Sequence, residues 1–220
     1  MDKQQQKVSE DGKRIFTGDR DEKLRISTYP RAYNIEAMCL GHRRLVTGTI
    51  QIGTDRLVST SGDGTVRLWR MNNGEEEQVL QIADDKTIIK PVAVWHSRSL
   101  LVFLVPSLRQ VVLCSIDQST TTIKEYQRVN LSFEAQTATV DEVNDCVWLT
   151  SLFARHLSEE GARSLLIEQL KWKRDQVTGE EKLTEVLPTD EEYKLIKELH
   201  RLVWPLLPGS WLVFTCCFEL

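Results

Sequence analysis

The chain has 220 residues, of which 41% are hydrophobic and 27% are charged, and its formal net charge is −4 at pH 7. This length allows one or two domains with a sizeable core, and the negative balance argues against binding nucleic acid through bulk positive charge, leaving only a local basic patch. The number of cysteines is odd and none forms a CxxC pair, which indicates neither a disulfide framework nor a zinc site and favours a reducing, intracellular compartment. The cysteines are Cys39, Cys114, Cys146, Cys216 and Cys217.

The chain opens with the polar stretch MDKQQQKVSEDGKR, which predicts no secretory signal peptide. Its first part, MDKQQQK, is also a poor strand sequence, so we expect the strands to start at about Arg14. No stretch reaches the roughly 18 apolar residues that a membrane-spanning helix needs. We therefore expect no membrane partner.

From about Arg14 to about Pro188, short apolar segments rich in β-branched residues alternate with turn residues, a pattern that predicts strands. In chain order the expected strands are 14–17, 23–27, 35–40, 46–52, 56–60, 65–69, 78–82, 91–96, 100–105, 110–116, 124–131, 137–143, 145–152, 164–172 and 183–186. They group in fours with a period of roughly 40 to 50 residues, which is typical of β-propeller blades. We therefore expect an all-β, partial β-propeller domain over residues 1–188.

The segment TDEEYKLIKELHRLVW, Thr189 to Trp204, has apolar residues at helical spacing. Thr189 is a suitable N-cap, and the acidic residues after it favour the start of a helix. Pro205 and Pro208 end the pattern. The sequence therefore predicts a C-terminal helix over residues 189–207, followed by an apolar tail over 208–220 that is either a last buried strand or an uncovered end.

One repeat stands out in the predicted strands, with Gly41-His42 followed by STSGDGTVRLW, Ser59 to Trp69. A histidine, a serine, an aspartate and a tryptophan in this order resemble a WD repeat, which the family uses as a hydrogen-bonded network inside the blade. Buried polar groups must be paired, and these side chains suit one another as partners. We expect His42, Ser59, Asp63 and Trp69 to form such a structural network.

The same residue types raise the alternative of a catalytic triad of Ser59, His42 and Asp63. A triad needs an exposed nucleophile and an oxyanion hole, and a serine in the middle of a strand offers neither. The four histidines of the chain lie in no metal-ligand spacing such as HExxH, and there is no GxGxxG or P-loop. The sequence therefore predicts no enzyme, no metal and no cofactor.

An earlier copy of the repeat, TGDRDEKLRIS from Thr17 to Ser27, differs from the second where the blade network should be. Thr17 falls on Ser59 and Asp21 on Asp63, but Ser27 falls on the tryptophan position. The glycines of the turn are replaced by charged residues, and in a propeller this turn opens on the face where partners usually dock. The alternative is that these charged residues have no binding role and are simply exposed to solvent.

Together, the segments TGDRDEKLRIS, CLGH (Cys39 to His42) and STSGDGTVRLW resemble the WD-repeat, non-catalytic subunit of the eukaryotic tRNA guanine-N7 methyltransferase. The resemblance is strong from about Val8 to Trp69. Beyond Trp69 it is weak and consists only of the spacing of the predicted blades. It implies a protein that does no chemistry, binds and stabilises the catalytic subunit, and helps position tRNA for methylation of a guanine in the variable loop. It also implies a mainly nuclear location.

The resemblance further implies that the charged turn contacts the catalytic subunit, by charge-paired docking. The matching positions are Arg20, Glu22, Lys23 and Arg25. The family has a seven-bladed propeller, whereas this chain has room for about four blades, so we expect an open arc with exposed sheet edges.

Two other functions remain open from the sequence. The first is a generic WD-repeat interaction scaffold, such as a ubiquitin-ligase adaptor or a chromatin factor, since the fold alone does not decide function. The second is direct tRNA binding through a small basic-aromatic cluster, which we expect to be an outer strand and turn instead. That cluster is Lys171, Trp172, Lys173 and Arg174.

Overall fold

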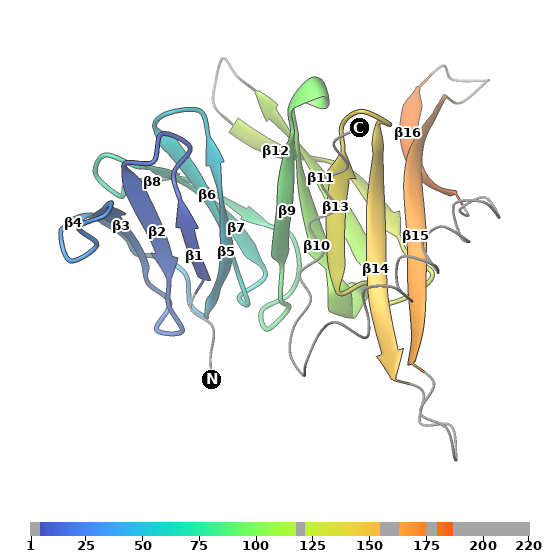
Figure 1. Cartoon of the computed structure of the whole chain (residues 1–220), viewed down its shortest axis with the longest axis horizontal. Coiled ribbons are helices and arrows are strands. Elements are labelled where there is room, and N and C mark those ends of the chain that lie inside the picture. The colour runs from blue at the N-terminus through green and yellow to red at the C-terminus, as the bar shows by residue number, and fades with distance from the viewer. Residues whose placement is uncertain (1–4, 118–121, 155–162, 175–179, 187–220) are drawn as a thin grey trace. The chain divides into compact units, whose positions relative to one another are not determined.

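The computed structural model describes residues 5–117, 122–154, 163–174 and 180–186 of the chain (Figure 1). It divides into two compact units, Met1–Ala135 and Gln136–Leu220. The first unit holds three four-stranded antiparallel sheets and the second holds one. In every sheet, four strands that are consecutive in the sequence pair in sequence order, which is the meander of a propeller blade.

The first two sheets span residues 5–81 of the chain. The first sheet contains β1 (Gln5–Val8), β2 (Arg14–Gly18), β3 (Leu24–Thr28) and β4 (Ile35–Cys39). The second sheet contains β5 (Val46–Ile52), β6 (Arg56–Ser61), β7 (Thr65–Arg70) and β8 (Glu76–Gln81).

The third and fourth sheets follow. The third contains β9 (Lys90–Trp95), β10 (Leu100–Val105), β11 (Gln110–Asp117) and β12 (Thr122–Asn130), with the short 3-10 helices η1 (His96–Arg98) and η2 (Pro106–Leu108) in its hairpins. The fourth contains β13 (Thr137–Asp141), β14 (Cys146–Ala154), β15 (Arg163–Arg174) and β16 (Glu181–Val186).

The prediction of an all-β, partial WD-repeat propeller is confirmed, and each expected strand is present with small shifts at its ends. The expectation that the strands start at Arg14 was wrong, because Gln5–Val8 forms β1. This strand pairs with β2 in a register that places Val8 opposite Ile15. The open edge of β2 supplies the hydrogen-bonding partners, so tertiary context overrides the weak strand propensity of QQK.

Two predicted segments fall beyond the described part of the chain. The helix over 189–207 and the apolar tail over 208–220 lie outside the described residues, so the domain division at residue 188 stays a prediction. Among the residues that the structure describes, no helix has the length and apolar character that a membrane crossing would need.

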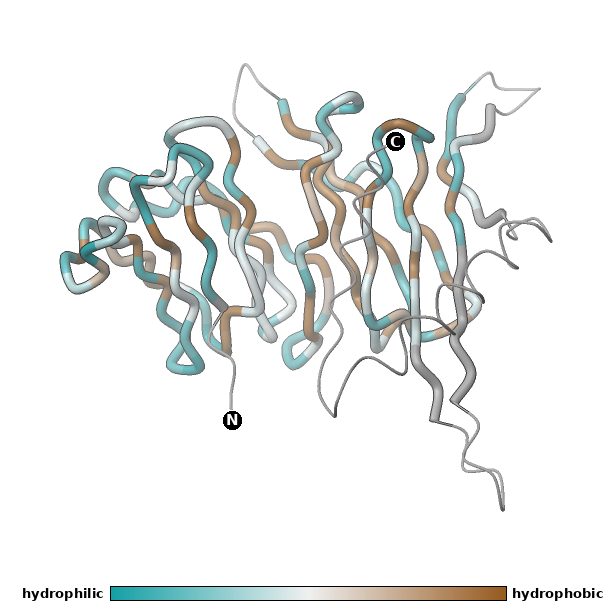
Figure 2. The backbone as a smooth tube through the Cα atoms, viewed as in Figure 1, coloured by the Kyte–Doolittle hydropathy of each residue, from teal (hydrophilic) through white to brown (hydrophobic). Residues whose placement is uncertain are grey.

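The hydrophobic core of the first unit lies between adjacent sheets, where Figure 2 shows apolar residues along the strands. Phe16 and Ile26 of the first sheet pack in one cluster with Leu57 and Trp69 of the second. Val58 of the second sheet belongs to a separate cluster that includes residues of the third sheet. Neighbouring residues of a strand point to opposite faces, so Leu57 and Val58 join different clusters, and the second sheet is packed on both of its faces.

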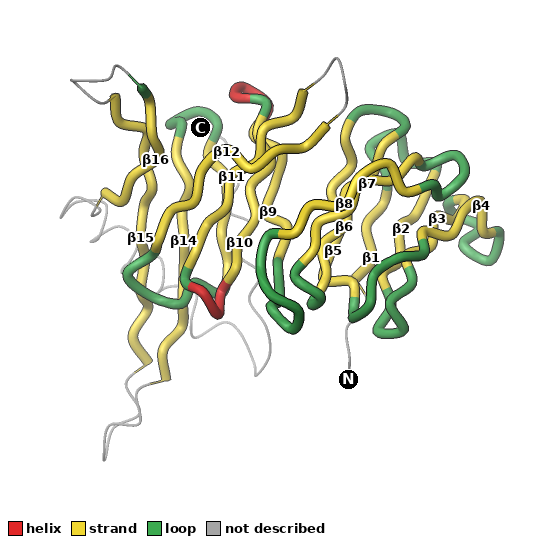
Figure 3. Tube along the Cα trace, turned by 180° about the vertical axis from the view of Figure 1, so that it is seen from behind, coloured by secondary structure: helices red, strands yellow, loops and turns green. Residues whose placement is uncertain are grey.

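Several loops of the first unit lie at the same end of its sheets, at the lower edge of Figure 3. We call this end the turn face and define it by residues 19–23, 43–45, 62–64 and 82–89. Backbone hydrogen bonds tie the loops together: the N–H of Val46 donates to the carbonyl of Asp19 at 3.3 Å, and the N–H of Ile89 donates to that of Ser61 at 3.3 Å. The turn face is therefore one continuous surface over the first two sheets.

Candidate partner-binding site and the network behind it

A chain of buried side chains runs through the second sheet. The indole N–H of Trp69 donates to Ser59 Oγ at 2.7 Å, Ser59 Oγ lies 2.7 Å from His42 Nε2, and His42 Nδ1 lies 3.1 Å from Asp63 Oδ2. The geometry is satisfied when the imidazole carries its proton on Nδ1 and accepts the hydroxyl proton of Ser59 on Nε2. The four residues predicted as a blade network are thus joined by hydrogen bonds in this order.

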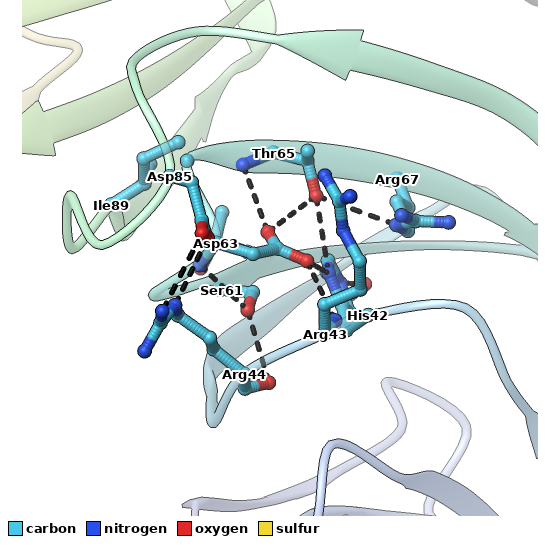
Figure 4. Close-up of polar contacts among 12 residues, drawn as sticks. His42, Arg43, Arg44, Ser61, Asp63, Thr65, Arg67, Asp85 and Ile89 are labelled. Carbon is cyan, nitrogen blue, oxygen red and sulfur yellow. Dashed lines mark hydrogen bonds and ion pairs between the residues drawn. The ribbon is translucent and has the colours of Figure 1, made fainter.

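Asp63 also fixes the backbone around the turn between β6 and β7 (Figure 4). Its carboxylate accepts the backbone N–H of Arg43 at 2.9 Å, the backbone N–H of Thr65 at 3.0 Å and the hydroxyl of Thr65 at 2.6 Å. Burial alone would raise the pKa of Asp63, but the hydrogen bonds from His42, Thr65 and Arg43 outweigh it and hold this pKa well below the usual range. The folded protein therefore stabilises the ionised form of the Asp63 carboxyl group.

Acidification is expected to destabilise the fold through Asp63. A carboxyl whose pKa is lower in the folded state stabilises the protein fully above its unfolded pKa of about 4, and this contribution is lost as the pH falls further. The free energy of unfolding in urea should therefore change little between pH 7 and pH 5 and drop steeply between pH 4 and pH 2. An unchanged free energy of unfolding down to pH 3 would contradict this assignment. Other carboxyls with a lowered pKa contribute in the same direction: Asp11, Asp19, Glu36, Asp85 and Asp141.

The contacts of Ser59, His42 and Asp63 have the order of a catalytic triad but not its exposure. Ser59 and Asp63 are 0% exposed and His42 is 5% exposed. Ser59 lies inside β6, and its oxygen already accepts the indole proton of Trp69. A substrate has no route to this oxygen, so the arrangement acts as a structural network rather than as a nucleophile.

The charged turn of the first sheet keeps the backbone shape of the glycine turn that it replaces. Glu22 has a φ of 69°, close to the 74° of Gly64 at the matching position of the second sheet. The N–H of Asp19 donates to the carbonyl of Lys23 at 2.9 Å and closes the turn. A non-glycine residue in this left-handed conformation costs about 1 kcal/mol, so the turn holds Glu22 in place of a residue that would fit with less strain.

The structure brings three of the predicted contact residues together on this turn, since Arg20, Glu22 and Lys23 are all exposed. Arg25 lies further in, half-buried on β3, and its guanidinium donates to Asp19 Oδ2 at 3.2 Å. The pKa of Asp19 is lowered, because backbone N–H groups and Arg25 outweigh the effect of burial.

Asp19 was not among the predicted contact residues, although it stands at the start of the DRDEK string. The DRDEK segment could have indicated Asp19, because an aspartate in a turn often accepts a hydrogen bond from the backbone N–H two residues later. Here its carboxylate lies at 3.4 Å from the N–H of Asp21.

The basic-aromatic cluster of the last sheet lies on β15, the third of four strands, and not on an outer strand as expected. Trp172 and Lys171 are both half-buried. Successive residues of a strand face opposite sides of the sheet, so Trp172 lies on the other face from Lys171. Lys171 and Trp172 therefore do not form one surface.

Within the described ranges, no three side chains of the types that bind metals gather in one place. Cys39, Cys114 and Cys146 are free and buried. Burial raises the pKa of the Cys39 thiol to about 12 and that of the Cys114 thiol to about 12, so both are held as inert thiols.

Comparison with known proteins identifies the origin of this combination of blade network and charged turn. Residues 2–146 match the family model described as the tRNA methyltransferase TRM82 WD40 domain. The chain belongs to this family. The resemblance found in the sequence is thereby confirmed, and the match extends the TRM82-type region well beyond Trp69.

Among curated relatives of the TRM82-type chain, a protein of Anopheles gambiae is 46% identical over 77 residues, which are 35% of this chain and 20% of that protein. A Drosophila melanogaster protein is 43% identical over 68 residues, which are 31% of this chain and 16% of that protein. Both are named tRNA (guanine-N(7)-)-methyltransferase non-catalytic subunit wuho. The chain spans about a fifth of the length of the curated relatives that it matches.

The solved C-terminal WD40 domain of Sif2 has the same fold, with a TM-score of 0.55. It is 17% identical and covers 66% of this chain, which in turn covers 41% of that domain. This likeness supports the WD40 architecture of the TRM82-type chain and nothing further.

Proposed function

We propose that this chain is a non-catalytic WD-repeat subunit of a tRNA guanine-N7 methyltransferase, which binds and stabilises the catalytic subunit through the charged turn. The family match and the names of the relatives support the assignment. The observation that carries it is Glu22, an exposed charged residue held in the left-handed conformation that a glycine occupies in the next sheet. Turn geometry alone does not call for a charge here, whereas a charge-complementary partner does.

The docking mechanism follows from how the turn is held. Arg20, Glu22 and Lys23 project from a closed turn, so they are presented to a partner with little loss of backbone freedom on binding. Arg25 braces Asp19 behind them. The same assignment carries two further proposals, namely that the complex positions tRNA for methylation in the variable loop and that it acts in the nucleus.

Removing the charges of Glu22 and Arg25 should strongly weaken the complex. We would co-express the full chain with the catalytic methyltransferase subunit of the same organism and compare the native protein with the Glu22→Ala/Arg25→Ala variant in a pull-down. Because truncating partners of interfacial ion pairs costs about 2 kcal/mol or more, we expect the affinity to fall by at least about thirtyfold.

The matched control is Arg14→Ala/Glu36→Ala, which removes another ion pair of the same sheet. Arg14 begins β2, at the opposite end of that strand from the turn. This variant should bind like the native chain. If a folded native chain retains no catalytic subunit, the proposal fails and a generic scaffold, such as a ubiquitin-ligase adaptor or chromatin factor, becomes the better interpretation.

A further inference from the structure

We propose that the docking surface extends from the charged turn onto the loop Arg43–Leu45, where Arg43 pairs with a carboxylate of the catalytic subunit and Leu45 meets an apolar side chain beside it. This inference rests on the proposed function, since it names a second part of the same interface. None of the contact residues predicted from the sequence lies in this loop.

The loop is physically continuous with the charged turn. The residue after it, Val46, donates its N–H to the carbonyl of Asp19, the first residue of the turn, at 3.3 Å. The pKa of Arg44 is raised first by its hydrogen bond to Asp85 and also by the charge of nearby Glu22. The loop and the turn therefore share one electrostatic environment on the turn face.

The backbone of the loop is fixed at each of its three residues by the turn between β6 and β7. The N–H of Arg43 donates to Asp63 at 2.9 Å, the carbonyl of Arg44 accepts from Ser61 Oγ at 3.1 Å, and the carbonyl of Leu45 accepts the N–H of Gly62 at 3.0 Å. Figure 4 shows Arg43 and Arg44 held against this turn. A loop held this firmly loses little entropy on binding, which is the condition for a contact surface.

The two arginines of the loop differ in what neutralises them. Arg44 donates to both oxygens of Asp85, at 2.9 Å and 3.4 Å. Arg43 is exposed, extends away from that ion pair (Figure 4), and forms no ion pair with any carboxylate in the part of the chain that the structure describes. Leu45, next to the ion pair, is 41% exposed. The charge of Arg43 acts on Asp85 only at a distance, so the loop presents one arginine that forms no ion pair beside an exposed leucine.

These features fit a protein better than RNA. The exposed carboxylates of the turn face, Asp21, Glu22, Asp84 and Asp85, lie among its exposed cations, Arg20, Lys23, Arg43 and Lys86, and such a mixture of charges does not make the positive surface that attracts phosphates. Exposed apolar groups at Leu45 and Ile88 suit the apolar centre of a protein interface. The partner surface should therefore place a carboxylate opposite Arg43 and an apolar side chain over Leu45.

The test measures the affinity of purified full-length chain for the purified catalytic subunit by calorimetry. Arg43→Glu should weaken binding by about thirtyfold, because it opposes like charges, and Leu45→Ser by about fivefold. The Arg43 side chain is exposed and its backbone N–H is retained in every variant, so folding, checked by circular dichroism, should be unchanged. The matched control is Arg31→Glu in the loop between β3 and β4, whose affinity should stay within about twofold.

The outcomes separate this inference from the proposed function. Absence of binding by the native chain overturns both. Binding that is lost in Glu22→Ala/Arg25→Ala but kept in Arg43→Glu and Leu45→Ser overturns only the extended surface. If Arg43→Glu leaves the affinity for the catalytic subunit intact and instead weakens tRNA binding by the complex, the loop contacts RNA and the inference is also overturned.

Discussion

The Asp63→Ala variant should lose about 3 kcal/mol of the free energy of unfolding, the loss typical when one partner of a buried charged network is removed. Asp63 is fully buried and accepts hydrogen bonds from His42, Thr65 and the backbone of Arg43. Alanine would leave these donors buried without an acceptor, and each such group costs about 1 kcal/mol or more. Native proteins are only marginally stable, so the variant should be largely unfolded at moderate urea concentrations.

Urea unfolding of the full chain followed by tryptophan fluorescence measures this loss, because Trp69 lies at the other end of the same network. The matched control is Asp55→Ala, which removes an aspartate that is exposed and paired only at the surface with Arg56. The control should change the free energy of unfolding by less than about 0.5 kcal/mol. A loss below about 1 kcal/mol for Asp63→Ala would show that the network contributes little to stability.

Gly64→Ala should destabilise the protein by more than about 2 kcal/mol, for two reasons that act together. Its φ of 74° disfavours any residue with a Cβ by about 1 kcal/mol. An added Cβ would also press on the carbonyl oxygens of Ala83 and Asp84. The backbone has little freedom to yield, since the carbonyl of Gly64 accepts the N–H groups of Ile82 and Ala83 at 3.0 Å and 3.1 Å.

Gly53→Ala separates the two reasons. Gly53 has a φ of 59°, but an added Cβ there would meet no atom within 4 Å. This control should therefore show only the conformational cost of about 1 kcal/mol. Equal losses in the two variants, measured by thermal unfolding of the full chain, would contradict the steric part of the argument.

The strands were predictable because each has a short apolar pattern bounded by turn residues, and a blade pairs only strands that are neighbours in the sequence. The exception is β1, whose residues QQKV carry almost no such pattern. Its formation depends on the open edge of β2 and on a hydrogen bond from the N–H of Glu10 to Gln51 of the next sheet. Contacts of this kind come from distant residues and leave no trace in a local window.

The site was predictable in part for the same reason. The alignment of two repeats pointed to the turn that carries Glu22, because a local comparison suffices to see charges in place of glycines. It did not point to Arg43, whose backbone is fixed by Asp63, 20 residues later in the chain. Nor did it show that Arg25 binds Asp19 across the turn, since that contact depends on the conformation that the turn adopts.

The left-handed conformation of Glu22 sets stability and recognition against each other at one residue. A glycine adopts this conformation without the steric cost, so Glu22→Gly should leave the blade at least as stable while removing a charge from the docking surface. Glu22→Gly would therefore be a separation-of-function allele, with which cells could reveal what this protein does apart from its proposed partner.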